Sequence, residues 1–161
     1  MRFIFDLDST VIDSNHRRVC NIDGTIDLAH WRENSTPELV FKDGLLPLAT
    51  QWKRAKAKGA EIVVCTAREM GDADLAFLEF HGLEWDAMLS RPEGDRTPDD
   101  ILKRKMLREY AAGRGIAWQK FIKFSVMWDD CEKVIRRLTA EGLVVHNSNY
   151  VNKVLSACEN Y

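Results

Sequence analysis

The chain contains five short apolar runs that are predicted as β-strands, at residues 2–6, 61–66, 86–90, 122–128 and 143–147. Segments between them place apolar residues at helical spacing, which predicts helices at about 44–58, 72–81 and 130–141. A further helix is predicted to have Thr97 as N-cap and Pro98 as first helical residue, and it carries Lys103. Because strands that alternate with helices are typical of βαβ units, the sequence predicts an α/β fold around a mainly parallel sheet.

The composition favours one globular domain over residues 1–161, with 45% hydrophobic and 30% charged residues. The four cysteines lie far apart without a CxxC pair, and no apolar run near the start resembles a signal peptide or a membrane span. We therefore expect a reduced, cytoplasmic protein with no membrane partner.

A formal net charge of −2 argues against a surface that coats duplex nucleic acid. Segment 14–43 is expected to be an excursion from the sheet, and the oligomeric state, including a homo-oligomer, stays open.

The first apolar run ends in two carboxylates, Asp6 and Asp8, which are separated by one residue. In an extended chain these side chains point the same way, so they can converge on one centre. A hard cation such as Mg²⁺ needs only one or two carboxylates beside a substrate phosphate. The alternative is a strand that ends in an ordinary polar turn.

Three further features follow strand ends or helix starts in the same way. The run at 61–66 ends in Thr66 and is followed by Arg68, whose planar guanidinium suits a phosphate. Lys103 lies one turn into its helix, and the run at 122–128 leads into Asp129 and Asp130. In a parallel sheet all of these side chains are expected along the carboxyl edge of the strands, where ligands bind.

This order of motifs resembles the haloacid dehalogenase superfamily of phosphotransferases over nearly the whole chain. The resemblance implies a three-layer αβα Rossmann-like fold in which segment 14–43 is a small cap-like excursion. Three stretches are similar to the phosphatase domain of bacteriophage polynucleotide kinase-phosphatase, namely residues 66–71, 91–103 and 129–130.

That narrower resemblance implies a Mg²⁺-dependent 3′-phosphatase that acts on DNA or RNA ends or on 3′-nucleotides. Asp6 matches the nucleophile, which becomes an aspartyl phosphate, and Asp8 matches the general acid and base. Thr66 and Lys103 match residues that hold the phosphoryl oxygens, and Asp99 matches an acid that orients the lysine.

The same resemblance assigns the metal and substrate contacts. The metal set is Asp6, Asp8, Asp129 and Asp130, with either member of the last pair as the direct ligand. Substrate contacts are assigned to Arg68, Arg91 and Arg17, the last with Arg18 as a neighbour that could serve instead. Cations are needed there because a phosphate dianion beside two aspartates must be offset electrostatically.

Two departures from the family pattern are visible. Ser9 occupies a position where most of the superfamily has Gly, so the turn must accept a side chain or change its backbone. No GxxxxGK[ST] loop is present, which predicts a stand-alone phosphatase. Two alternatives remain: a phosphatase of 5′-nucleotides or other small phosphoesters, and a non-catalytic module that binds phosphorylated ends.

Overall fold

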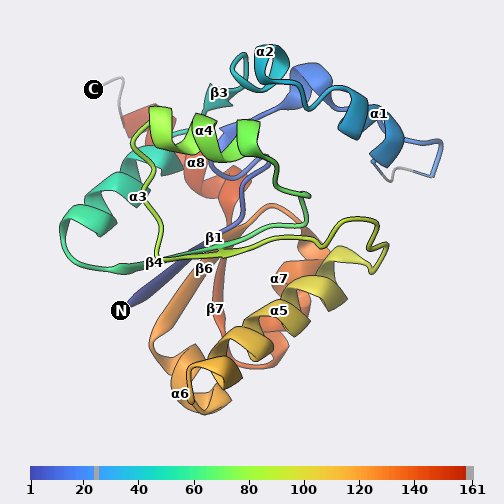
Figure 1. Ribbon diagram of the computed structural model, residues 1–161. Helices are drawn as coiled ribbons and strands as arrows, with labels where there is room; N and C mark the ends of the chain where they lie inside the picture. The colour runs from blue at the N-terminus through green and yellow to red at the C-terminus, as the bar shows by residue number, and fades with distance from the viewer. Residues whose placement is uncertain (24–25, 159–161) are drawn as a thin grey trace.

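A computed structural model describes residues 1–23 and 26–158, and its centre is a parallel sheet of five strands (Figure 1). The strand order is β5-β4-β1-β6-β7, and every pairing is parallel. The strands are β1 (Arg2–Phe5), β4 (Glu61–Cys65), β5 (Ala87–Leu89), β6 (Ser125–Asp129) and β7 (Val144–Asn147). With β1 in the middle, the first carboxylates of the chain lie at the centre of the sheet's carboxyl edge.

Helices cover both faces of the sheet and complete a three-layer αβα arrangement (Figure 1). One face carries α3 (Leu48–Ala57), α4 (Asp72–Phe80) and α8 (Ser148–Cys158), and the other carries α5 (Asp99–Gly113), α6 (Trp118–Lys123) and α7 (Glu132–Ala140). Successive residues of β1 serve the two cores, since Phe5 stacks on Trp52 at 5.1 Å while Ile4 packs toward Leu107 and Phe121. The predicted fold class is confirmed.

The excursion at 14–43 leaves and rejoins the body through a short antiparallel pair, β2 (Ile12–Asp13) and β3 (Gly44–Leu45). It contains the 3₁₀ turn η1 (Asn15–Arg17), α1 (Leu28–Glu33) and α2 (Pro37–Val40). The carboxylate of Asp27 caps α1 by accepting from the amides of Ala29 and His30, both at 3.0 Å. The ring of Phe41, just after α2, meets Phe77 of α4 edge-on at 5.9 Å, so the excursion rests against α4.

The structure corrects several predicted elements. The apolar run at 122–128 was expected as one strand, but its start belongs to α6, and β6 begins only at Ser125. The helix expected from 44 begins at Leu48, because Gly44 and Leu45 pair with β2. Pro98, and not Thr97, is the N-cap residue of α5. The C-terminal helix α8 had no counterpart in the prediction.

Other boundaries agree within two residues. All four cysteines are free. Within the described residues, none of the helices has both the length and the apolar character needed to cross a bilayer.

Candidate active site

A buried lysine and two aspartates form the centre of the sheet's carboxyl edge. Asp6 directly follows β1, Asp129 ends β6, and Lys103 reaches them from the second turn of α5. The Lys103 Nζ lies 2.8 Å from Asp6 Oδ1 and 2.7 Å from Asp129 Oδ2. Because Lys103 is only 2% exposed, these two carboxylates fix the position of its ammonium as well as its charge.

Asp130 joins this centre and completes a group of three carboxylates. Ligand oxygens of Asp6, Asp129 and Asp130 all lie within 4.8 Å of one another. A set of oxygen donors at this spacing suits a hard divalent cation. Asp8 was expected in the same set, but its carboxylate accepts hydrogen bonds from Arg68 and Ser14 instead. The reason is that β1 ends at Phe5, so the alternation of an extended strand no longer governs where Asp8 points.

The carboxylates of this group hold their protons more tightly than ordinary aspartates. Burial raises the pKa of Asp6 to about 7; Lys103 lowers it, but Asp129 and Asp8 raise it further. Burial and the charge of Asp6 also raise the pKa of Asp130 to about 6. Burial likewise raises the pKa of Asp129. The single positive charge of Lys103 therefore does not balance the negative charge of three ionised carboxylates. A bound divalent cation would supply the positive charge that is missing.

Asp8 lies in the opposite environment, between an arginine and a serine. Arg68 donates to it from Nε at 3.1 Å and from Nη2 at 2.5 Å, and the Ser14 hydroxyl donates at 2.5 Å. Burial would raise the pKa of Asp8, but the charge and hydrogen bonds of Arg68 outweigh it and the net shift is downward. Asp8 is thus held as a carboxylate while Arg68 is paired with it.

Arg17 and Arg68 belong to one buried cluster of arginines and aspartates. Arg17 donates to Asp43 at 2.9 and 2.7 Å, and Arg68 donates to Asp74 at 2.7 Å. The Arg17 guanidinium lies over the Trp31 ring, 4.1 Å from its centroid. The structure therefore brings both predicted arginines to the Asp8 side of the site and ties the excursion to it.

Sequence reasoning missed the partners that hold this cluster. Ser14, Asp43 and Asp74 carry no local motif, and Asp43 is 26 residues from Arg17 in the chain. Contacts between residues so far apart in the chain depend on the path of the excursion, and they leave no periodic pattern in the sequence.

Arg91 and Asp99 pair with each other next to the loop before α5. Arg91 donates to the backbone oxygens of Ala67, Asp95 and Thr97 at 2.7, 3.0 and 2.8 Å, and to Asp99 Oδ1 at 2.6 Å. Asp99 was expected to orient Lys103, but its carboxylate turns back to Arg91, and Lys103 is oriented by Asp6 and Asp129. Arg91 thus fastens the loop before α5 to the loop after β4.

Two hydroxyl residues and a strained serine complete the edge. Thr66 is 1% exposed, and its hydroxyl oxygen accepts the Arg68 amide at 3.1 Å. Thr10 donates to Ser148 at 2.9 Å and lies 3.4 Å from Asp6 Oδ2. Ser9 adopts φ 58°, so the turn keeps the left-handed conformation that glycine favours and places a serine in it.

Comparison with solved structures identifies the class of fold. The haloacid dehalogenase-like hydrolase SP0104 of Streptococcus pneumoniae superposes with a TM-score of 0.59 at 8% identity, over 94% of this chain and 90% of that one. A chain in the Pnkp1/Rnl/Hen1 complex gives 0.64 at 23% identity, over 90% of this chain and 44% of that one. The fold is therefore that of haloacid dehalogenase-type hydrolases.

The sequence itself defines the family more narrowly. The profile of the Bacteriophage T5 5′-deoxynucleotidase family matches residues 1–160, and the chain belongs to this family. The 5′-deoxynucleotidase of Escherichia phage T5 is 34% identical over 84 residues, which cover 50% of this chain. The matched segment spans about a third of that relative, 34% of its length.

Proposed function

We propose that the protein is a Mg²⁺-dependent phosphatase that removes the phosphate from deoxynucleoside 5′-monophosphates through an aspartyl phosphate. The observation that carries this proposal is the placement of Asp6 beside Lys103 and the Asp129–Asp130 pair at the carboxyl edge of β1. Membership of the 5′-deoxynucleotidase family supports the substrate class. The phage relative favours the host cytoplasm as the place of action.

In the first step, a carboxylate oxygen of Asp6 attacks phosphorus and the bond to the 5′-oxygen breaks. Lys103 and the Thr66 hydroxyl bind the phosphoryl oxygens, where negative charge must be stabilised. A Mg²⁺ ion held by Asp6, Asp129 and Asp130 would supply further charge stabilisation and orient the phosphate. Attack by water on the aspartyl phosphate then restores Asp6.

Asp8 acts as the general acid that protonates the departing 5′-oxygen and then as the base that takes a proton from water. Its low pKa in the free site is a consequence of Arg68. A substrate phosphate that takes over the hydrogen bonds of Arg68 would free Asp8 from this partner and raise its pKa. Arg68 thus has two roles, as the resting partner of Asp8 and as a phosphate ligand.

The polynucleotide 3′-phosphatase implied by the motif resemblance is the second candidate. What favours it is the stretch from Arg91 to Lys103, together with Arg17 at its expected spacing from Asp6. The contacts of Arg91 weigh against a direct role of that residue in recognising ends, because its donors are directed to three backbone oxygens and to Asp99. We therefore rank the 5′-nucleotidase first.

The test measures phosphate release from 3′- and 5′-deoxymononucleotides and from oligonucleotides phosphorylated at either end, with Mg²⁺ and with EDTA. Release from 5′-mononucleotides that requires Mg²⁺ and is lost in Asp6→Asn is the expected result. Preference for 3′-phosphorylated ends would instead support the second candidate function, a polynucleotide 3′-phosphatase. Tight binding of phosphorylated ends without any release would instead indicate the non-catalytic module.

A further inference from the structure

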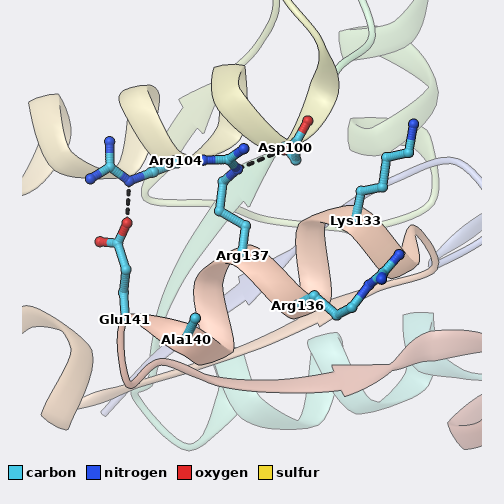
Figure 2. A pocket seen from close by; sticks show the side chains of 7 residues that line it. All are labelled: Asp100, Arg104, Lys133, Arg136, Arg137, Ala140 and Glu141. Carbon is cyan, nitrogen blue, oxygen red and sulfur yellow. Dashed lines mark hydrogen bonds and ion pairs between the residues drawn. The ribbon is translucent and has the colours of Figure 1, made fainter.

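A groove between α5 and α7 gathers cations that the proposed reaction does not use (Figure 2). It has a volume of about 640 Å³ and is lined by Asp100, Arg104, Lys133, Arg136, Arg137, Ala140 and Glu141. The lining thus contains four cationic side chains and two carboxylates, in a protein whose formal net charge is −2. The local excess of positive charge marks this groove as a candidate binding surface for an anion.

Two of the arginines are anchored in a way that leaves their outer nitrogens available. Arg137 donates from Nε to Asp100 Oδ2 at 2.6 Å, and Arg104 pairs with Glu141 through Nε. Neither uses its terminal nitrogens for a hydrogen bond within the described residues. The carboxylates therefore hold these guanidiniums in place while the bidentate face of each remains open, as phosphate binding requires.

The other two cations have even less compensation. Lys133 makes no ion pair within the described part of the chain, and Arg136 makes only a long contact from Nε to the Glu132 backbone oxygen at 3.4 Å. Glu141 is also shared with Arg108, which donates to it at 3.1 and 2.6 Å. Its single charge is thus divided between two arginines, and the groove is more positive than its lining alone suggests.

The arrangement suits a chain of phosphates better than a single one. Lys133 and Arg137 lie about one turn apart on α7, about 6 Å along its axis, and Arg104 extends the row from α5. Figure 2 shows these side chains spread along the groove and not converging on one point. Among the described residues, those that line the groove include no aromatic ring, so a bound strand would be held by its backbone without base stacking.

The groove also begins at the catalytic edge. Lys133 lies in the first turn of α7, four residues after Asp129, and Asp100 lies in the first turn of α5, which carries Lys103. We propose that this groove binds the phosphodiester backbone of single-stranded nucleic acid, independently of sequence, at a site separate from the phosphatase centre. Binding is expected to be weak and strongly dependent on salt.

The experiment measures fluorescence anisotropy of a labelled oligothymidylate of about 20 nucleotides without a terminal phosphate, in EDTA and at low salt. Lys133→Gln/Arg136→Gln removes two cations that have no acidic partner, so the fold is not at risk. Lys53→Gln/Lys58→Gln, on α3 and at its C-cap, removes two exposed cations from the opposite layer and is the matched control.

We expect the groove variant to weaken binding at least about fivefold and to reduce the salt slope by about 0.7 for each lost contact, with the control unchanged. Absence of binding by the unmodified protein, or equal losses in the two variants, would overturn the proposal. Complete displacement by inorganic phosphate at equal phosphate concentration, or equal binding to vesicles of anionic lipid, would also overturn it. Both variants should release phosphate from mononucleotides at the rate of the unmodified protein. Loss of nucleic-acid binding can therefore be distinguished from loss of the proposed phosphatase reaction.

Discussion

Asp6 and Asp8 are only two residues apart in the chain, yet they lie in opposite electrostatic surroundings. Asp6 lies on the metal side of the site, with Asp129, Asp130 and Lys103, and Asp8 lies on the arginine side, with Arg17 and Arg68. Asp6 shares its surroundings with two further carboxylates and one lysine, which raises its pKa to about 7. Asp8 lies against Arg68, which lowers its pKa. These surroundings suit the two roles in the proposed mechanism, a nucleophile that needs added positive charge and an acid that is paired until substrate arrives.

The difference arises where the chain leaves the sheet. Asp6 follows the last residue of β1 and donates its amide to the Trp128 backbone oxygen at 3.1 Å, so it stays beside β6 and its carboxylates. The chain then turns through Ser9 at φ 58°, and Asp8 is directed to the loop after β4. The turn separates two side chains that an extended strand would hold together.

The largest expected effect concerns the metal side. Asp6→Asn should reduce phosphate release from mononucleotides by at least about a thousandfold, because an amide cannot attack phosphorus. The thermal stability of this variant should not fall, since the change removes one negative charge from three carboxylates that only Lys103 balances. A rate near that of the unmodified enzyme in a steady-state phosphate assay would exclude Asp6 as the nucleophile.

The second prediction concerns the arginine side and depends on the leaving group. Asp8→Asn should slow release from a deoxynucleotide by about 100-fold, but release from p-nitrophenyl phosphate by much less, because p-nitrophenolate needs little protonation. The ratio of kcat values for the two substrates measures this difference. Equal losses on both substrates would assign Asp8 to positioning instead of proton transfer.

The third prediction tests whether the arginine cluster also holds the fold together. Arg17→Ala leaves the fully buried carboxylate of Asp43 without its main partner, so the free energy of unfolding should fall by about 3 kcal/mol. Arg18→Ala, which changes an exposed neighbour, is the control and should stay within about 0.5 kcal/mol. Urea denaturation of both variants supplies the values, and similar stabilities would contradict a structural role for Arg17.

These two sides also differ in how far sequence could predict them. Asp6, Thr66, Lys103 and the Asp129–Asp130 pair each follow a strand end or a helix start, and the parallel sheet collects such positions at one edge. The partners Asp43 and Asp74 come from segments without regular periodicity, so their contacts depend on tertiary structure alone. The apolar run at 122–128 illustrates the same limit, because it contains the end of α6 and most of β6 and its hydrophobicity suits either element.

The smallest expected effect is a pH-dependent response to Mg²⁺, and its sign follows from Asp6. The pKa of this group rises from the ordinary 3.8 to about 7 on folding, so the metal-free protein holds a proton that the unfolded chain releases. Its contribution to stability is therefore fully present below about pH 4 and is lost as the pH rises through about 7.

Mg²⁺ binds the ionised carboxylates and should offset this loss, so the increase in Tm on adding Mg²⁺ should be larger at pH 8 than at pH 5. Asp130→Asn should reduce the increase at pH 8, whereas Glu109→Gln on the exposed face of α5 should leave it unchanged. Equal increases at both pH values would mean that Mg²⁺ binds outside the three carboxylates. Of the two aspartates, only Asp8, whose partner is Arg68, would then lie in surroundings that match its proposed task.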